Sequence, residues 1–491
     1  MKNSAGMICK YGFLIYNKEG RTCTYAGEGR IRIMYEINFS KPIHVHFIGI
    51  GGISMSGLAE ILLSKGFKVS GSDNVASALT DELKNEGATI YIGQSSDNIT
   101  SDIDLVVYTA AIRNDNPEFG ACMEKNLPMI SRAELLGQIM RNYSYPIAIS
   151  GTHGKTTTSS MTSEILMAHD TDPTLSIGGI LPSIGGNVRI GSSEYFLTEA
   201  CEYTNSFLSF FPRYGVILNI DADHLDFFKD LNDIRNSFRK FAELLPENGA
   251  LVINGEIENL SEITASVKCP VITFGFDSSF DYYATDLSRN EAGFTCYTLH
   301  SPGGTYPVTL GVYGNHNVYN SLASLAISDV IGFDLPSSVK ALENCHGAKR
   351  RFEIKGTIGD ITVVDDYAHH PTEIEATLNA ARSYPHNHLW CIFQPHTYSR
   401  TKLLLHEFAD ALCLAEHVVL ADIYAARERD TLGISSKNLM EEIEKRGGDC
   451  HYFHSFSEIE IFLLENCNPG DLLITMGAGD VYRVGEELLG K

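Results

Sequence analysis

Two glycine-rich turns, each placed between an apolar run and a helical stretch, constrain the fold more than any other feature. The first turn follows residues 43–48 and reads GIGG over 49–52, and the second follows residues 146–150 and reads GTHGKT over 151–156. Such a turn lets backbone N–H groups approach a phosphate at the start of a helix. Strand–turn–helix units of this kind build α/β folds around parallel sheets.

The alternation of strand-like and helical stretches continues to the C-terminus and divides the chain into three α/β units. The length of 491 residues agrees with about three domains, at roughly 150 residues each. We place the units at 41–146, 147–342 and 343–491. Residues 1–40 show no clear period and form an N-terminal extension of open status. This extension is either a short accessory segment or a stretch that precedes a true start at Met34.

The composition excludes several classes of protein. Acidic residues outnumber basic residues 61 to 38, a formal net charge of −23, which argues against a nucleic-acid partner because such proteins need a basic surface. No run approaches about 18 apolar residues, so we predict no membrane insertion. The 11 cysteines include no C-x-x-C pair, which is typical of thiols in a reducing cytoplasm rather than of a disulfide scaffold or a zinc site. We therefore expect a cytoplasmic protein.

The sequence GTHGKT is a shortened relative of the phosphate-binding loop G-x-x-x-x-G-K-[ST]. In such a loop Lys155 supplies a positive charge and the Thr156 hydroxyl is a ligand for Mg²⁺. Two later strand-like runs end in side chains that suit a nucleotide-bound Mg²⁺: Glu199, Glu202, Asp221, Asp223, His224 and Asp226. The alternative for these acids is a solvated loop in a protein already rich in acid.

The first glycine cluster is weaker by itself. Asp73 lies 24 residues after Gly49, at the end of the next strand, where an acid commonly meets a ribose,. Ser54 stands where the third glycine of G-x-G-x-x-G is expected, which weakens a dehydrogenase interpretation. Two phosphate-type loops in one chain indicate an ATP-driven step on a nucleotide-linked substrate.

The third unit carries two further polar runs, DDYAHHP at 365–371 and QPHTYSR at 394–400. The adjacent His369 and His370 point opposite ways in an extended chain and chelate one ion poorly, so we do not favour zinc there. Arg400, with a histidine and a tyrosine nearby, suits a small carboxylate because a guanidinium can bond both oxygens. The alternative for this group is ordinary hydrogen bonding at the surface.

Taken together and in order, the motifs resemble the Mur ligases of peptidoglycan synthesis from about residue 43 to the C-terminus. The resemblance rests on HFIGIGGISMSGLAE, SGSD, GTHGKTTT, TEACE, NIDADHLDFF, GNHNVYN, AKRRFE, DDYAHHPTEI, FQPHTYSRT and TMGAGD. It implies an α/β fold of three domains: a Rossmann-like UDP-binding domain (41–146), a central P-loop ATPase-type domain (147–342) and a C-terminal Rossmann-like, amino-acid-binding domain (343–491). It also implies ATP-dependent addition of L-alanine to UDP-N-acetylmuramate through an acyl phosphate, with Mg²⁺, by a cytoplasmic monomer or homodimer.

The resemblance assigns roles to individual residues. Lys155, Glu199 and His224 are similar to catalytic groups, and Thr156, Glu199 and His224 to Mg²⁺ ligands. The implied ATP contacts are Gly151, Thr152, His153, Gly154, Lys155, Thr156, Thr157, His316, Asn317, Asn320, Arg351 and Asp366. The implied UDP contacts are Gly49, Gly51, Gly52, Ser72 and Asp73, and the implied amino-acid contacts are Tyr367, His369, His396 and Arg400.

The chain departs from the family pattern at two places, and two alternative functions stay open. Where relatives have the acidic run E-A-D-E-S-D, this chain has EACEYT over 199–204, and Thr397 replaces the arginine that usually follows the histidine of QPH. One alternative is a ligase that joins a recycled tripeptide to UDP-N-acetylmuramate. The other is a nucleotide-binding regulator without turnover, against which the intact Lys155, Thr156, Glu199 and His224 argue.

Overall fold

The computed structural model describes residues 36–491 except 110, 111, 114, 226 and 427, and the backbone of five short strands nearer the N-terminus. Those strands form two antiparallel sheets: β1 (Ile8–Cys9) with β2 (Gly12–Phe13), and β3 (Ile15–Tyr16) with β4 (Thr22–Ala26) and β5 (Arg30–Met34). The remainder of residues 1–35, and Asp226 of the acidic run, lie outside the described residues. A start at Met34 stays a prediction.

The first α/β unit is built on a five-stranded parallel sheet in the order β10-β9-β6-β7-β8. The loop 49–52 follows the central strand β6, at the point where the strand order reverses, which is where open α/β sheets bind nucleotides. The strands are β6 (His44–Ile48), β7 (Lys68–Asp73), β8 (Thr89–Ile92), β9 (Leu105–Tyr108) and β10 (Met129–Ser131). The helices are α1 (Ile53–Ser64), α2 (Ala78–Asn85), η1 (Ser96–Asn98), α3 (Pro117–Glu124) and α4 (Arg132–Met140).

The central unit holds a ten-stranded mixed sheet in the order β13-β12-β14-β11-β15-β16-β17-β18-β19-β20. Strands β12, β14, β11 and β15 to β18 pair in parallel, and antiparallel strands extend both edges. The strands are β11 (Tyr145–Ser150), β12 (Thr174–Leu181), β13 (Gly186–Arg189), β14 (Tyr195–Ala200), β15 (Tyr214–Ile217), β16 (Ala250–Asn254), β17 (Val271–Gly275), β18 (Tyr282–Arg289), β19 (Thr295–Ser301) and β20 (Gly304–Thr309). The helices are α5 (Lys155–Ala168), η2 (Pro182–Ile184), η3 (Tyr203–Ser209), α6 (Leu231–Ala242), α7 (Leu260–Thr264), α8 (His316–Ile331) and α9 (Leu335–Glu343).

The C-terminal unit contains a six-stranded sheet in the order β21-β22-β26-β23-β24-β25, parallel except for β21. Its strands are β21 (Glu353–Ile358), β22 (Ile361–Asp366), β23 (Leu389–Phe393), β24 (His417–Leu420), β25 (Asp449–Tyr452) and β26 (Leu472–Met476). Its helices are α10 (Pro371–Ala381), α11 (Tyr398–Leu403), α12 (Leu405–Leu412), α13 (Ser436–Lys445), α14 (Phe456–Asn466) and α15 (Tyr482–Leu488). The predicted α/β fold with three units is therefore confirmed.

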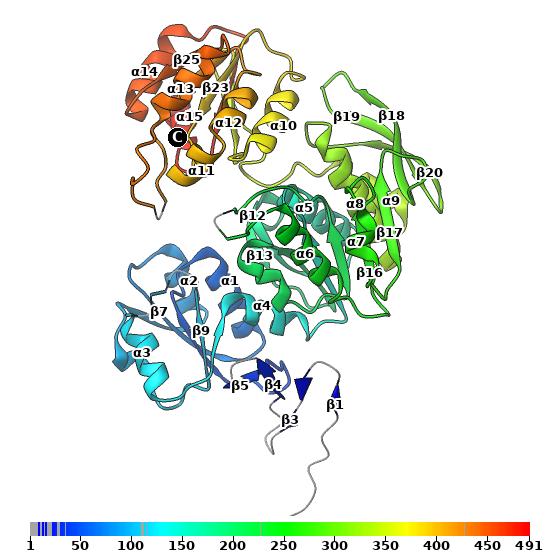
Figure 1. The fold of residues 1–491 in the computed structure, drawn as a ribbon, viewed down its shortest axis with the longest axis vertical. Helices are drawn as coiled ribbons and strands as arrows, with labels where there is room; N and C mark the ends of the chain where they lie inside the picture. The colour runs from blue at the N-terminus through cyan, green and yellow to red at the C-terminus, as the bar shows by residue number, and fades with distance from the viewer. Residues whose placement is uncertain are drawn as a thin grey trace, which may run out of the picture.

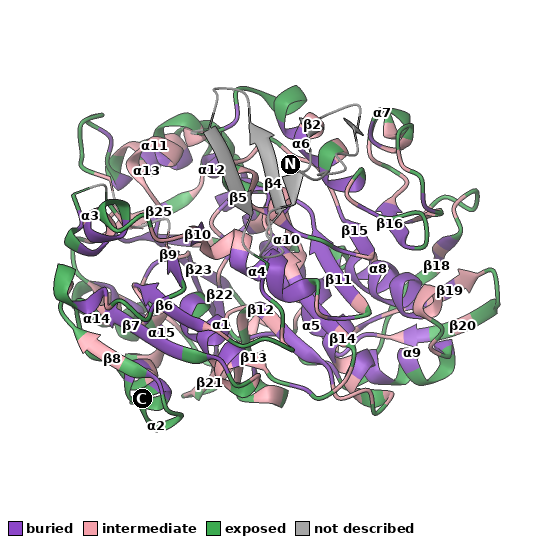
Figure 2. Ribbon diagram, turned by 90° about the horizontal axis from the view of Figure 1, so that it is seen from below, coloured by how far each residue is buried: buried purple, intermediate pink, exposed green. Residues whose placement is uncertain are grey.

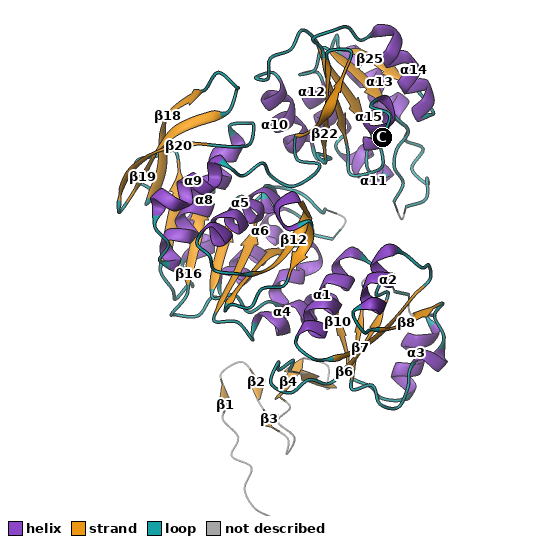
Figure 3. Ribbon diagram, turned by 180° about the vertical axis from the view of Figure 1, so that it is seen from behind, coloured by secondary structure: helices purple, strands orange, loops and turns teal. Residues whose placement is uncertain are grey.

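In Figure 1 the C-terminal unit lies at the top and the N-terminal unit at the bottom, and the central unit lies beside them at the right. Figure 3 shows helices on both faces of each parallel sheet. The predicted limit between residues 146 and 147 falls inside β11, and the limit between 342 and 343 falls one residue before α9 ends. No helix among the described residues is long and apolar enough to cross a membrane.

The apolar cores are distributed unevenly among the units. One buried cluster runs from the N-terminal sheet through α4 into η3 and α6 of the central unit, so these two units share a core. The C-terminal unit has clusters of its own on the two faces of its sheet. In Figure 2 the buried residues follow the strands and the helix faces that cover them. The junction between the first two units is thus packed like a protein interior.

Candidate active site

The loop 151–154 connects β11 to α5 and places Lys155 at the first position of the helix. Gly154 caps α5 with a φ of 84°, a left-handed conformation that favours glycine,. A Cβ on Gly154 would overlap Oδ1 of Asn320 on α8, so a larger residue has no room here. The Lys155 ammonium donates to the backbone oxygens of Gly151 and Thr152, the latter at 2.9 Å. The loop thus folds around its own lysine.

Glu202 is the charged partner of Lys155. Its Oε2 lies 3.0 Å from Lys155 Nζ, and its side chain is only 2% exposed. Burial by itself lowers the pKa of Lys155, but the surrounding acidic groups, Glu202 first among them, together outweigh burial and raise it. The other oxygen, Oε1, is buried without a hydrogen bond among the described residues and lies 3.7 Å from His224 Nε2. The sequence places Glu202 at the end of a strand-like run but does not single it out as a site residue.

Thr156 and Glu199 form the second polar pair at the start of α5. The Thr156 hydroxyl donates to Glu199 Oε2 at 3.1 Å, and the Gly178 N–H donates to Glu199 Oε1 at 2.6 Å. Burial raises the pKa of Glu199, and the Gly178 N–H opposes that rise. A hydroxyl and a carboxylate are hard oxygen ligands, and Mg²⁺ uses few protein ligands because it keeps waters and substrate phosphates. The pair fits Mg²⁺, although the described residues contain no cluster of three His, Cys, Asp or Glu side chains placed to hold a metal ion.

A cavity of about 850 Å³ opens beside this loop, between the central and C-terminal units. Its lining includes eight predicted ATP contacts: His153, Gly154, Thr157, His316, Asn317, Asn320, Arg351 and Asp366. Phe294 and Tyr313, whose rings stack at 4.6 Å, add flat apolar surface of the kind a base needs,. The four other predicted contacts, Gly151, Thr152, Lys155 and Thr156, lie in the loop and first turn of α5 and do not line the cavity. The neighbouring aromatic residues were not predicted.

The arginines at 350 and 351 face different surroundings. Arg350 Nε donates to Asp365 Oδ2 at 2.9 Å, and its terminal nitrogens donate to the backbone oxygens of Gly477 and Gly479, so it holds the strand ends together. Arg351 lines the cavity instead. Asp366 accepts from the N–H groups of Phe352 and Ala368, and burial raises its pKa to about 6. The predicted pair of residues 351 and 366 therefore lies together at the cavity wall.

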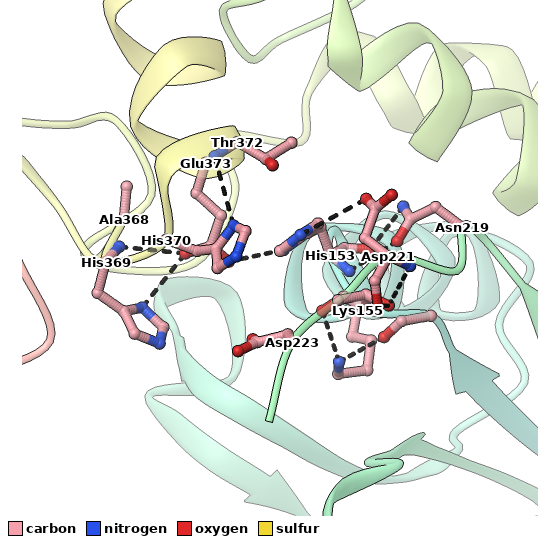
Figure 4. A network of polar contacts seen from close by, with 12 residues as sticks. His153, Lys155, Asn219, Asp221, Asp223, Ala368, His369, His370, Thr372 and Glu373 are labelled. Carbon is pink, nitrogen blue, oxygen red and sulfur yellow. Dashed lines mark hydrogen bonds and ion pairs between the residues drawn. The ribbon is translucent and has the colours of Figure 1, made fainter. Parts of the chain in front are cut away.

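Polar contacts join the central and C-terminal units beside the cavity. His153 Nδ1 lies 3.4 Å from Glu373 Oε1, and the His153 and His370 rings lie 5.0 Å apart. Figure 4 shows His153 between Asp221 and the Glu373–His370 pair. Glu373 Oε2 also lies 3.2 Å from His369 Nδ1, and its pKa is held well below the usual range because the two nearby imidazoles outweigh burial. Glu373 was not predicted as a site residue.

The four predicted amino-acid contacts lie together at the edge of the C-terminal sheet. The ring of His369 is 5.4 Å from that of Tyr367 and 5.8 Å from that of His396. Arg400 Nη2 donates to Asp223 Oδ1 at 3.1 Å, which ties α11 to the central unit. The guanidinium has further N–H groups and can also bind a carboxylate. These aromatic and basic side chains form a cluster next to the central unit.

The predicted UDP contacts lie at the carboxyl edge of the first sheet. The Gly51 N–H donates to Asp73 Oδ2 at 2.9 Å, and α1 begins at Ile53 without a side-chain cap. The uncapped N–H groups of α1 suit an anion such as a diphosphate. Ser72 is fully buried, and its hydroxyl donates to Glu118 Oε2 at 2.6 Å. In this structure Ser72 therefore bonds within the protein rather than facing solvent.

Three family profiles match the chain in sequence: Mur ligase family, catalytic domain (residues 44–144), Mur ligase middle domain (149–328) and Mur ligase, glutamate ligase domain (350–479). The chain belongs to the Mur ligase family. As a Mur ligase it is 59% identical over 93% of its length to the UDP-N-acetylmuramate–L-alanine ligase of Agathobacter rectalis, and 60% identical over 93% to that of Lachnospira eligens. Both relatives are covered over 100% of their own length.

Solved structures of this family resemble the fold of most of the chain. The UDP-N-acetylmuramate–alanine ligase MurC of Thermotoga maritima superposes with a TM-score of 0.76 at 30% identity, covering 91% of this Mur ligase and 98% of that chain. A murein peptide ligase of Psychrobacter arcticus superposes with a TM-score of 0.68 at 25% identity, again covering 91% and 98%. The fold is therefore shared between alanine ligases and peptide ligases.

Proposed function

We propose that this Mur ligase catalyses the ATP-dependent joining of L-alanine to UDP-N-acetylmuramate in peptidoglycan precursor synthesis. The observation that carries the proposal is the identity of 59–60% to two relatives of that name, over their whole length. The site agrees with it, since a glycine loop of the phosphate-binding type, a cavity of about 850 Å³ and the Arg400 guanidinium lie at the junction of the central and C-terminal units. We place the reaction in the cytoplasm, where ATP and nucleotide-linked sugars are available, and expect a monomer or a homodimer.

The proposed reaction begins with attack of the muramate carboxylate on the γ-phosphorus of ATP, which releases ADP and forms an acyl phosphate. The amine of alanine then attacks the acyl carbon, and the tetrahedral intermediate expels phosphate and loses a proton to give the amide. Two anions must meet in the first step, so positive charge near the transferred phosphoryl group lowers the barrier. Lys155 supplies that charge once phosphate oxygens take the places now held by the backbone oxygens of Gly151 and Thr152.

Thr156, Glu199 and His224 are the residues we assign to Mg²⁺. When bound, Mg²⁺ would neutralise charge on the phosphate oxygens. Burial lowers the pKa of His224 and keeps the imidazole neutral, the form that can coordinate a metal ion,. Tyr367, His369, His396 and Arg400 would hold alanine, with the Arg400 guanidinium on its carboxylate. Gly49, Gly51, Gly52, Ser72 and Asp73 would hold the UDP moiety.

The experiment that tests the proposal measures phosphate release from ATP in the presence of UDP-N-acetylmuramate, with L-alanine, glycine, L-serine or a tripeptide as acceptor. We expect the highest kcat/KM with L-alanine, loss of turnover when EDTA removes Mg²⁺, and no turnover for Lys155→Met. Turnover with the tripeptide alone would identify a recycling ligase instead. Binding of ATP without phosphate release for any acceptor would identify a regulator.

A further inference from the structure

Glu373, in the first turn of α10, contacts the central unit and the C-terminal unit with the two oxygens of one carboxylate. Its Oε1 lies 3.4 Å from His153 Nδ1, in the loop that precedes α5. Its Oε2 accepts from the His369 N–H at 3.1 Å and lies 3.2 Å from His369 Nδ1. Figure 4 shows the carboxylate between these two histidines. Each oxygen of Glu373 therefore contacts a histidine of a different unit.

Both histidines present an N–H group to this carboxylate. His369 Nδ1 lies between the Tyr367 backbone oxygen, at 3.1 Å, and Glu373 Oε2, and it must carry a proton because both neighbours are acceptors,. His153 lies between two carboxylates, since its Nε2 is 3.6 Å from Asp221 Oδ2. Burial by itself lowers the pKa of His153, but the hydrogen bond and charge of Glu373 and the charge of Asp221 outweigh burial and raise it. Glu373 is thus a shared acceptor for two imidazoles.

The two histidines belong to two different parts of the candidate site. The His153 N–H donates to Asn219 Oδ1 at 2.8 Å, and Asn219 Nδ2 donates back to the His153 oxygen at 3.1 Å, which fixes the loop to the chain after β15. The side chain of His153 lines the cavity that we assign to ATP. His369 belongs to the cluster that we assign to alanine. Glu373 therefore connects the two sets of contacts directly.

Stabilisation of the helix start explains only part of this arrangement. An acid in the first turn of a helix is favoured by the helix dipole, and the bond from the His369 N–H is of this local kind,. The local role does not require Oε1 to meet a histidine that lies 220 positions away in the chain. A carboxylate offers two acceptor oxygens, whereas the amide of glutamine has the same shape but one acceptor. Only the carboxylate can accept from both imidazoles at once.

We propose that Glu373 is a positioning residue that couples the ATP-binding loop to the alanine contacts. The proposal rests on the function proposed above. With Oε1 held by His153, Oε2 fixes the ring orientation and the protonated nitrogen of His369. Loss of the His153 contact leaves the carboxylate held at one oxygen only, so that it regains rotamer freedom and orients His369 less well. Alanine binding then depends on a histidine of the ATP loop that is not itself an alanine contact.

The test measures steady-state KM values of the full chain for L-alanine, ATP and UDP-N-acetylmuramate. We expect Glu373→Gln to raise the KM for L-alanine by about tenfold to a hundredfold, the size of a hydrogen bond to a charged group. Its KM for UDP-N-acetylmuramate should equal that of the wild type. A merely structural role would lower kcat through the fraction of folded enzyme and leave all three KM values unchanged. An unchanged KM for L-alanine would overturn the proposal.

His153→Gln tests the coupling itself. We expect this variant also to raise the KM for L-alanine, although His153 lies outside the alanine contacts. In the variant that carries both changes, the two effects on this KM should not add, because either change breaks the same connection. An effect of His153→Gln on the KM for ATP alone would overturn the coupling, and so would full addition of the two effects.

Glu375→Gln is the matched control. Glu375 lies on the same helix, is exposed, and has no hydrogen bond or ion pair among the described residues. We expect its three KM values to equal those of the wild type. A wild type that uses another acceptor in place of L-alanine would contradict the proposed function alone, and the same KM comparison with that acceptor would test Glu373. A wild type without turnover for any acceptor would contradict both proposals.

Discussion

Protonation of His396 links the pH to the stability of the C-terminal unit. Its half-buried ring stacks on Tyr424 at 5.7 Å, and its Nδ1 is buried without a hydrogen bond among the described residues. Burial lowers the pKa of His396 to about 4, and the charges of His369 and Arg400 act in the same direction. The folded state therefore favours the neutral ring, while an unfolded histidine titrates near 6.5.

The sign of the effect follows from the proton count. Between about pH 4 and 6.5 the unfolded chain binds more protons at this position than the folded chain, so the histidine lowers stability as the pH falls. Replacing His396 with Phe keeps the stacked ring and removes the proton site. We expect the wild type to lose up to about 2 kcal/mol more unfolding free energy than His396→Phe between pH 7.5 and 5. Urea unfolding followed at both pH values measures this difference, and parallel curves for the two proteins would contradict the assignment.

Local motifs single out individual residues where the residues of a motif are neighbours in sequence. Lys155 and Thr156 could be singled out because the loop, the strand before it and the helix after it are contiguous. Glu373 could not, since its partner His153 is 220 positions away in the chain and only the packed fold brings the two together. The roles assigned to the predicted site residues stay predictions.

Helix α4 shows how one element joins two units. Gly137 faces the Ser209 backbone oxygen, while Leu136, Ile139 and Met140 of the same helix enter the shared apolar cluster. In the sequence, a glycine inside a helical stretch indicates only a weaker helix. The structure gives the physical reason for this glycine, which is the close approach of another backbone. Strand order within each sheet and the extension of the central sheet by β18 to β20 likewise depend on long-range pairing.

A substitution at this contact tests the packing of α4. Gly137→Ala gains helix propensity, but its Cβ meets a backbone atom that cannot turn away, so we expect a net loss of about 1–3 kcal/mol in unfolding free energy,. Gly120→Ala on α3 is the matched control, because the space around its Cβ is empty and only the gain of about 1 kcal/mol in propensity remains,. Thermal unfolding of both variants gives the comparison. Equal or greater stability of Gly137→Ala would contradict the close contact.

At the scale of the molecule, the cavity of the candidate site lies between the central unit and the C-terminal unit, which do not share an apolar core. The N-terminal and central units share an apolar core, whereas the C-terminal unit has clusters of its own and meets the central unit beside the cavity through polar pairs such as His153–Glu373 and Arg400–Asp223. The alternating pattern in the sequence predicted three α/β units, but it carries no information on how tightly each pair of units is joined. The net charge of −23 repels anionic substrates, so their binding depends on cationic side chains close to the site,.

The central claim is that ATP activates a carboxylate which alanine then captures. Transfer of ¹⁸O tests it most directly, using UDP-N-acetylmuramate labelled in both carboxylate oxygens, with unlabelled ATP and L-alanine. One labelled oxygen leaves with the phosphate when the amine displaces it, and the other stays in the amide. We therefore predict one ¹⁸O in each phosphate released and one in each amide, measured by mass spectrometry. Amide formation with unlabelled phosphate would contradict the account.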